Sequence, residues 1–244
     1  MKVENVNPYA GDTREKGKQV RDMFNAIAPA YDFMNRAMTF GLDRLWLRRL
    51  VKAVSATGAE AIVDLATGTG DVALALARKM PSARIHGMDL SEGMLEKARE
   101  KAANSECGSR LSFEQADCLS TGLDDECARA VTVAYGVRNF ADIAAGYREM
   151  HRILKPGGTL AVLELSRPAN PLIKPLYTIY TRLLIPTAGR IVAGDGDAYR
   201  YLLQSIAAAP QRDAMTRLMT EAGFSKATYH SLFFGVCTLY TAVK

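Results

Sequence analysis

The chain has 244 residues, 48% of them hydrophobic and 23% charged, a composition typical of a globular protein with room for one large α/β domain. The formal net charge of +5 is compatible with an anionic ligand, with nucleic acid or with an anionic membrane surface. We expect no membrane-spanning helix, no signal peptide and no metal, and the four separated cysteines indicate reduced thiols of a cytoplasmic protein.

The first part of the chain predicts a helical lid. Residues 1–13 are polar, and we expect them to be mobile. From residue 14 to about residue 54 apolar side chains recur at helical spacing, with Pro29 as an interruption and a second helix expected at about 43–54. We therefore assign residues 1–54 to an N-terminal lid.

Strand and helix patterns then alternate along the chain. The expected strands are 62–65, 84–88, 111–115, 130–135 and 159–165. The expected helices are 71–80, one capped by Ser91, and 141–154. This alternation predicts a parallel sheet with helices on both faces. A further helix at 211–222 precedes two β-like runs, 227–232 and 236–242, which predict a terminal hairpin within a single domain of residues 1–244.

Residues 168–209 interrupt the alternation with apolar helical runs and several prolines, which predicts an inserted helical cap. Between residues 167 and 194 there is no acidic residue, whereas Arg167, Lys174, Arg182 and Arg190 are interleaved with apolar side chains. This pattern is typical of transient contact with an anionic membrane surface or a prenyl chain. Packing of the cap on its own domain or in a homodimer is the alternative.

The turn at residues 68–70 is the most informative motif. Gly68 and Gly70 follow the first expected strand and precede a helix, so the backbone can approach a ligand closely. Ligands of open α/β sheets bind beyond the carboxyl ends of the strands, where this chain carries Asp89 after the second strand. A carboxylate there can accept hydrogen bonds from ribose hydroxyls, although Asp89 could also be a surface turn residue.

The charge of the turn favours S-adenosylmethionine over a dinucleotide. The turn lacks the third glycine of the dinucleotide fingerprint, and Asp71 stands beside the place of the pyrophosphate. S-adenosylmethionine instead carries an ammonium and a sulfonium, which carboxylates attract, and its single carboxylate can accept hydrogen bonds from the N–H groups of the turn.

The segment Asp64-Leu-Ala-Thr-Gly-Thr-Gly-Asp71 is similar to motif I of class I methyltransferases. From about residue 20 to 240 the chain resembles the UbiE/MenG quinone-biosynthesis C-methyltransferases. The segments that carry this resemblance are Met23-Phe-Asn-Ala-Ile-Ala-Pro-x-Tyr-Asp-x-Met-Asn35, Tyr135-Gly-Val-Arg-Asn139, Leu154-Lys-Pro-Gly-Gly158 and Asp197-Ala-Tyr-Arg-Tyr-Leu202. The resemblance implies a class I methyltransferase Rossmann-like α/β fold, with a mostly parallel seven-stranded sheet and a C-terminal antiparallel hairpin strand.

The resemblance also implies a cofactor, S-adenosylmethionine, which becomes S-adenosylhomocysteine. The implied cofactor contacts are Asp64, Gly68, Thr69, Gly70, Asp89, Asp117 and Cys118. Thr69 and its flanking glycines would hold the methionine portion, Asp89 the ribose, and Asp117 with Cys118 the adenine. The implied acceptor is a polyprenyl quinol, demethylmenaquinol or the benzoquinol precursor of ubiquinone. We expect no nucleic-acid partner, because no dense basic stripe with aromatic residues is present.

Methylation of a quinol ring carbon requires that a hydroxyl on the ring lose its proton. We assign Arg138 to phenolate stabilisation or water orientation, because a guanidinium stays protonated, and Asn139 to a quinol oxygen. A structural pair that pins the loop is the alternative for these two residues. Tyr31, in the lid, is a further candidate for catalysis as well as for substrate contact. The other candidates for substrate contact are Asp32 in the lid and Tyr199 and Tyr201 in the cap.

Asp43 departs from the family pattern, which usually has histidine at this position after Phe-Gly-Ile. If that histidine is a base, Asp43 replaces it or the proton takes another route, whereas the other interpretation is a helix cap. Two further hypotheses remain open: a methyltransferase of another small phenolic acceptor, and a non-catalytic scaffold that binds S-adenosylmethionine in a quinone-synthesis assembly. We expect a cytoplasmic protein peripherally associated with the membrane.

Overall fold

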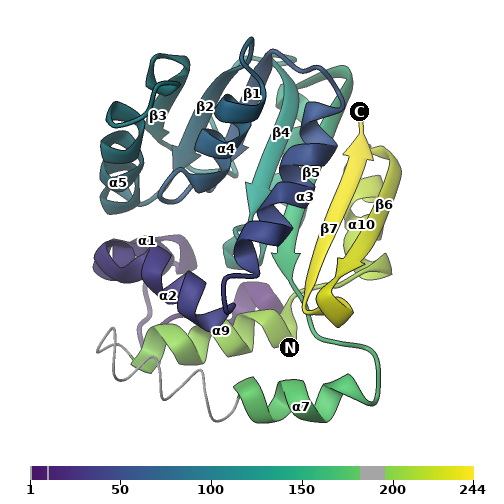
Figure 1. The fold of residues 1–244 in the computed structure, drawn as a ribbon. Helices are drawn as coiled ribbons and strands as arrows, with labels where there is room; N and C mark the ends of the chain where they lie inside the picture. Colours follow the sequence, from purple (N-terminus) through teal and green to yellow (C-terminus); the bar gives the residue numbers. More distant parts are fainter. Residues whose placement is uncertain (1, 10, 182–195) are drawn as a thin grey trace.

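The computed structural model describes residues 2–9, 11–181 and 196–244, and it contains a seven-stranded sheet (Figure 1). The strands are β1 (Ala61–Leu65), β2 (Arg84–Asp89), β3 (Leu111–Gln115), β4 (Ala128–Ala134), β5 (Leu154–Leu165), β6 (Ser225–Leu232) and β7 (Cys237–Val243). Their order is β3-β2-β1-β4-β5-β7-β6. The first five strands are parallel, and β7 runs antiparallel to both β5 and β6. The predicted sheet and its terminal hairpin are confirmed.

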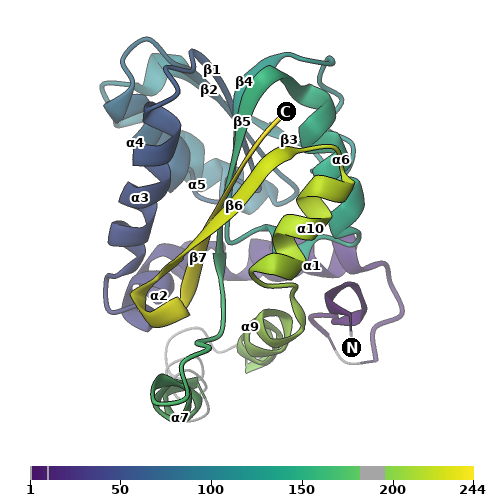
Figure 2. The same ribbon diagram turned by 90° about the vertical axis from the view of Figure 1, so that its right-hand side faces the viewer.

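Helices cover both faces of the sheet, as Figure 2 shows. On one face lie α3 (Asp43–Ser55) and α4 (Asp71–Lys79), whose apolar side chains form a core with Ile62, Ile85 and Leu163. On the other face lie α6 (Ile143–Ile153), which packs on β5, and α10 (Asp213–Glu221), which packs on β6 and α6. Helix α5 (Glu92–Ala103) lies beside β2 and β3, and the Ser91 hydroxyl accepts its Met94 N–H at 3.2 Å, which confirms the predicted cap.

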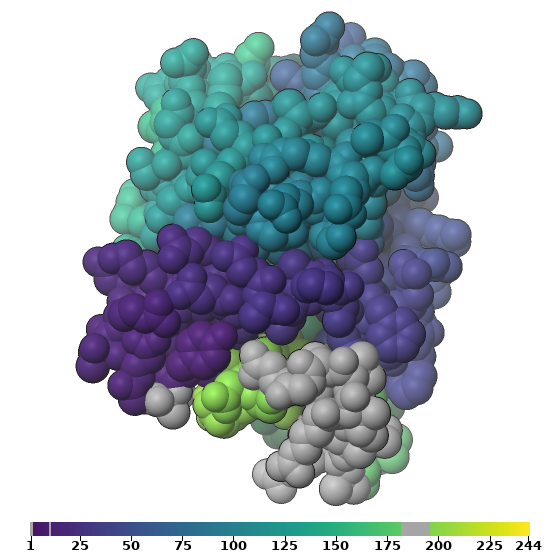
Figure 3. Space-filling view, turned by 90° about the vertical axis from the view of Figure 1, so that its left-hand side faces the viewer, coloured from purple at the N-terminus to yellow at the C-terminus, as the bar shows by residue number. Residues whose placement is uncertain are grey.

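The carboxyl end of the parallel strands is covered by the lid and the cap. Two helices of the predicted lid, α1 (Lys16–Ile27) and α2 (Tyr31–Met38), lie here, joined by a 3₁₀ turn at Ala28–Ala30 that contains the expected interruption at Pro29, whereas the third, α3, packs on a face of the sheet because its apolar side chains belong to that core. We therefore use the name lid for α1 and α2. Figure 3 shows these N-terminal residues as a layer between the sheet domain and α9 (Gly196–Ala208). The other described helix of the cap is α7 (Ile173–Ile179), whereas residues 182–195 of the predicted cap, including Arg182 and Arg190, lie outside the described residues.

Two features differ from the sequence-based expectation. Residues 1–13 were expected to be mobile, but Val3 and Val6 are buried, and Lys16 Nζ donates a 2.8 Å hydrogen bond to the Val3 carbonyl. Two valines in a short polar segment are too few to give a periodic signal, which is why the pattern missed them. In addition, β5 begins at Leu154 rather than residue 159, because pairing with β4 resumes across the Lys155–Gly158 turn after a register shift.

Candidate active site

The glycine-rich turn lies between β1 and α4. Gly68 and Gly70 have φ angles of 55° and 80°, in the left-handed region that glycine adopts without strain. Beneath the turn Asp64 is buried, and its two carboxylate oxygens accept 2.6 Å hydrogen bonds from Thr67 Oγ1 and Thr132 Oγ1. Burial raises the pKa of Asp64 to about 6. Asp64, a predicted cofactor contact, therefore lies where it supports the turn from below.

Asp89, at the end of β2, joins the turn to the following loop. Its Oδ2 accepts the Gly68 N–H and its Oδ1 accepts the Ser91 N–H, each at 2.9 Å. A cavity of about 80 Å³ is lined by Asp89 together with Asp117 and Cys118. Burial raises the pKa of Asp89, and it raises that of the Cys118 thiol far enough to keep the thiol protonated. The structure brings together the three residues that the sequence assigned to the ribose and the adenine.

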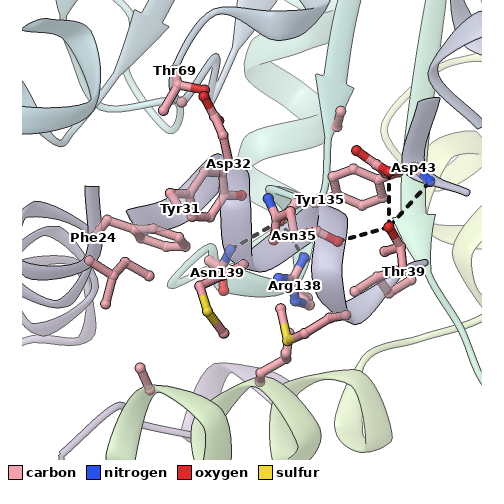
Figure 4. A pocket seen from close by; sticks show the side chains of 18 of the residues that line it. Phe24, Tyr31, Asp32, Asn35, Thr39, Asp43, Thr69, Tyr135, Arg138 and Asn139 are labelled. Carbon is pink, nitrogen blue, oxygen red and sulfur yellow. Dashed lines mark hydrogen bonds between the residues drawn. The ribbon is translucent and has the colours of Figure 1, made fainter. Parts of the chain in front are cut away.

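A hydrogen-bonded network ties the lid to the turn. Thr69 Oγ1 donates to Asp32 Oδ1 at 2.6 Å, a contact visible in Figure 4. Lys101 Nζ, from α5, lies 2.5 Å from Asp32 Oδ2, 2.6 Å from Asp71 Oδ1 and 2.8 Å from Thr69 Oγ1. Helices α2, α4 and α5 therefore meet at a single ammonium group beside the glycine turn.

Lys101 modifies the charge argument made from the sequence. Asp71 was expected to repel a pyrophosphate as a free carboxylate, but it is paired with Lys101. The two carboxylates of Asp32 and Asp71 share one ammonium, so the cluster keeps one negative charge. The preference for a cationic ligand is therefore weaker than the sequence indicated, although its sign is unchanged.

A second cavity, of about 190 Å³, lies between the turn, the lid and α9. It is lined by the predicted catalytic and substrate residues Tyr31, Asp32, Asp43, Arg138, Asn139, Tyr199 and Tyr201. Figure 4 shows Tyr31, Arg138 and Asn139 close together in this cavity. The rest of the lining is largely apolar and includes Met34, Met38, Leu47, Leu165, Tyr177, Tyr180, Leu202 and Val236. An aromatic head group and an apolar tail are compatible with this combination.

Arg138 is held by a buried partner that sequence reasoning missed. It lies in a 3₁₀ turn, Val137–Asn139, directly after β4. Its Nη1 lies 2.8 Å from Glu164 Oε1, and its backbone N–H donates to Glu164 Oε2 at 3.1 Å. Burial alone would lower the pKa of Arg138, but the Glu164 carboxylate and two nearby tyrosines raise it overall. The guanidinium is therefore a fixed positive charge with a fixed orientation.

Four buried polar atoms of this cavity have no hydrogen-bond partner among the described residues. They are Arg138 Nε, Asn139 Oδ1 and the hydroxyls of Tyr135 and Tyr201. A buried polar atom without a partner costs roughly 1–3 kcal/mol, so several in one cavity indicate that a polar ligand completes them. Tyr135 also has a φ of 59°, a strained conformation of the kind that gathers at functional sites.

Asp43 lies at the start of α3 and lines the same cavity. Its Oδ1 accepts a 2.9 Å hydrogen bond from Thr39 Oγ1, as Figure 4 shows. The expected helix cap is not formed by its side chain, because Asp43 is already the first residue of the helix and the residue before it is Leu42. The other predicted carboxylate of this cavity, Asp32, is bound to Thr69 and Lys101, which leaves Asp43 as the freer candidate base.

The sequence pattern missed Glu164, Lys101 and Lys16. Glu164 interrupts an apolar strand, and an acid in a buried strand is a usable signal because it needs a partner. Lys101 reads as part of the solvated face of a helix, so only the fold reveals its contacts. Among the described residues no three histidine, cysteine, aspartate or glutamate side chains form a group that could hold a metal, and no helix there is long and apolar enough to cross a membrane.

Comparison with known proteins places the chain in a family. The model of the ubiE/COQ5 methyltransferase family matches residues 12–244. The chain is 41% identical over 241 residues to the demethylmenaquinone methyltransferase of Bacteroides fragilis, covering 99% of this chain and 98% of that protein. It is 42% identical over 231 residues to the ubiquinone/menaquinone biosynthesis C-methyltransferase UbiE of Geobacter sulfurreducens, covering 94% and 90%.

Solved structures agree on the fold. The S-adenosylmethionine-dependent methyltransferase SibL superposes with a TM-score of 0.63 at 18% identity, over 84% of this chain and 56% of that one. Identity this low supports the fold alone. The match of the family model over nearly the whole chain, together with relatives above 40% identity, is decisive: this protein belongs to the ubiE/COQ5 methyltransferase family.

Proposed function

We propose that this protein transfers the methyl group of S-adenosylmethionine to a ring carbon of a polyprenyl quinol, with demethylmenaquinol as the first candidate. The benzoquinol precursor of ubiquinone is the second, because one similar relative is named for both pathways. The observation that carries the proposal is the group of four unpartnered polar atoms in a mostly apolar cavity beside the glycine turn. Two ring oxygens of a quinol could meet such atoms, while an apolar tail follows the lining.

The residues around the turn fit S-adenosylmethionine. A Cβ at Gly70 would lie 3.0 Å from Ala98 Cβ, so only glycine keeps the turn both left-handed and close-packed. Asp89 faces the smaller cavity and can exchange the Gly68 N–H for a ribose hydroxyl. The single negative charge of the Asp32, Asp71 and Lys101 cluster suits an ammonium group. When bound, the cofactor supplies a methyl group on a sulfonium, which makes the methyl carbon electrophilic.

On the acceptor side, Arg138 stabilises the negative charge that a quinol gains when it is deprotonated. Its guanidinium stays charged and Glu164 holds its orientation, so no reorganisation is needed when that charge develops. Asn139 and Tyr201 supply the other polar contacts to the ring oxygens. Tyr31, whose pKa is raised by burial, remains neutral and packs edge-on against Phe24 at a ring distance of 6.0 Å. It can therefore hold the ring by packing and hydrogen bonding.

Asp43 receives the proton of the ring hydroxyl, directly or through a water molecule. One of its oxygens is oriented by Thr39, so the side chain is held in the cavity where the ring hydroxyl would lie. Proton transfer to this group creates the phenolate whose charge reaches the ortho carbon, and Arg138 then holds that charge beside the methyl donor. Once the ortho carbon has gained the methyl group and the thioether has left, that carbon loses its proton and the ring oxygen regains one, which restores the aromatic quinol.

A long prenyl tail implies peripheral contact between this cytoplasmic protein and a membrane. The exposed cations Arg167 and Lys174 border the described part of the cap, where no acidic residue occurs from residue 165 to 181. Electrostatic attraction to anionic lipids is worth about 1 kcal/mol for each cation near the surface. A homodimer through the cap is a further possibility that sedimentation would test.

One assay tests the proposed reaction. The protein is incubated with methyl-labelled S-adenosylmethionine and, separately, with reduced demethylmenaquinone, the benzoquinol precursor and simple phenols without a tail. Transfer to a quinol is expected. Transfer to the phenols alone would favour the hypothesis that the protein methylates another small phenolic acceptor. Tight cofactor binding without transfer to any acceptor would favour the hypothesis of a non-catalytic scaffold that binds S-adenosylmethionine.

A further inference from the structure

Three phenylalanines project into solvent from strained backbone positions. Phe40, Phe233 and Phe234 have φ angles of 52°, 42° and 56°, in the left-handed region. Their exposed fractions are 76%, 50% and 65%. A left-handed conformation costs a bulky residue roughly 1–2 kcal/mol, and glycine would avoid that cost. The fold gains no compensating burial from these rings, so their placement calls for another explanation.

These rings lie at the end of the molecule that α7 also occupies. Phe233 and Phe234 form the 3₁₀ turn between β6 and β7, with ring centroids 5.3 Å apart, and Phe40 lies between α2 and α3. Figures 1 and 2 both show the β6–β7 turn and α7 at the end opposite the C-terminus. Helix α7 adds further exposed apolar side chains, namely Leu172, Leu176 and Ile179. We call this set of three phenylalanines and three aliphatic residues the apolar end.

The apolar end is continuous with the larger cavity. The Phe40 ring lies 6.0 Å from the ring of Tyr180, and Tyr180 lines the cavity. Val236, two residues after Phe234, lines it as well. An apolar chain leaving the cavity past either residue would therefore reach exposed apolar side chains rather than water.

The charges around the apolar end are basic. Arg167 and Lys174 are exposed, and Arg212 Nη2 donates to the Arg167 carbonyl at 2.5 Å, below the β6–β7 turn. Within the described residues, the segments 165–181 and 225–237 carry no acidic residue. Exposed aromatic rings with cations nearby are complementary to an anionic lipid surface, in which rings enter the interface and cations meet the headgroups.

We propose that the apolar end docks on an anionic lipid bilayer, with Phe233 and Phe234 entering the interfacial layer so that the mouth of the larger cavity faces the lipid. The docking itself is inferred from the exposure of the apolar side chains, the strained backbone of the three phenylalanines and the basic residues near them. Only its purpose, the entry of a prenyl tail, rests on the proposed function. The prediction differs from simple electrostatic adsorption because the aromatic pair, and not the charge alone, sets the affinity.

The test compares Phe233→Ser/Phe234→Ser with Tyr229→Ser in co-sedimentation with vesicles. Tyr229 is a matched control, since it is an exposed aromatic residue of the same hairpin that packs along the strand against Tyr240. With vesicles of phosphatidylglycerol and phosphatidylcholine, the double variant is expected to bind about ten- to a hundredfold more weakly, because two half-exposed rings no longer enter the lipid. The control should bind like the wild type, and an unchanged melting temperature verifies folding.

Equal vesicle affinity of the double variant and the wild type would overturn the proposal. So would a loss of self-association, measured by sedimentation without lipid, that accounts for the whole change, because the apolar end would then be an interface between two copies of this chain. A water-soluble quinol without a tail separates this test from the proposed function. The double variant should methylate it at the wild-type rate, whereas failure of the wild type with every quinol would refute the proposed function and leave the vesicle result standing.

Discussion

The substitution Glu164→Gln examines the buried pair that orients Arg138. Glutamine keeps the size of the side chain, but its single amide oxygen can replace only one of the two carboxylate oxygens, of which Oε2 accepts the Arg138 N–H at 3.1 Å and Oε1 the Leu165 N–H at 2.9 Å. It removes the negative charge that lies 2.8 Å from Arg138 Nη1. Because both side chains are buried, the guanidinium would be left as an uncompensated charge away from water.

The expected loss of stability is large. Removing one member of a buried ion pair costs ~3–5 kcal/mol, a substantial part of the roughly 5–15 kcal/mol that stabilises a domain. For a chain of this length the melting temperature should fall by about 6–20 °C. Methyl transfer should fall at temperatures where the variant is still folded, since Arg138 would no longer hold its orientation. Affinity for S-adenosylmethionine should change little, because Glu164 does not line either cavity.

A double variant separates the structural role of the pair from its chemical role. Arg138→Met/Glu164→Gln removes both charges, so calorimetry should show most of the lost stability restored. Methyl transfer should nevertheless stay low, because the positive charge beside the acceptor is absent. If the double variant recovered transfer together with stability, Arg138 would be a structural pin. If Glu164→Gln alone lowered the free energy of unfolding by less than about 1 kcal/mol, the ion pair would behave like a solvent-exposed one. The claim that burial makes this pair important for stability would then be wrong.

Five further substitutions test other parts of the site. Asp89→Ala should weaken cofactor binding by titration calorimetry while Arg138→Ala spares it, and equal losses would refute this division of roles. Lys101→Met should expose the lid to proteolysis, because the contacts of Lys101 Nζ with Asp32 at 2.5 Å, Asp71 at 2.6 Å and Thr69 at 2.8 Å are lost; a protease pattern like that of the wild type would count against a tied lid. Asp43→Asn should lower the rate of transfer and leave its dependence on cofactor concentration unchanged, whereas wild-type turnover would exclude Asp43 as the base. Burial lowers the pKa of Lys16 from 10.5 to about 8, so between about pH 8 and pH 10.5 the unfolded chain binds more protons than the folded one and the free energy of unfolding rises with pH. Lys16→Met should remove this rise in denaturant titrations, and a free energy of unfolding that still rises equally with pH would contradict the lowered pKa of Lys16.

The parts of the fold that could be predicted from the sequence are those encoded by local pattern. The alternation of apolar strands with amphipathic helices, and the glycine turn with its left-handed angles, depend on neighbouring residues. Asp89, Asp117 and Cys118 could be grouped in advance because parallel strands end at one edge of a sheet. Arg138 and Asn139 were selected by family resemblance rather than by any charge argument.

Other features depend on contacts between distant segments. Glu164 meets Arg138 only because β5 pairs with β4, and Lys101 meets Asp32 only because the lid packs beside α5. In the same way, the burial of Val3 depends on the lid, since Lys16 binds its carbonyl. Such contacts leave no periodic or local pattern in the sequence. The residues that line the two cavities could therefore be predicted, whereas the residues that orient them, such as Glu164 and Lys101, could not.

The central claim is that one cavity presents a quinol ring to a methyl donor with Arg138 beside it. The most direct measurement is mass spectrometry of the product formed from methyl-labelled S-adenosylmethionine and demethylmenaquinol, with cofactor affinity measured on the same preparations. The account predicts the label on a ring carbon for the wild type, and a strongly reduced yield with unchanged cofactor affinity for Arg138→Ala. A label on a ring oxygen, or an Arg138→Ala variant as active as the wild type, would contradict it.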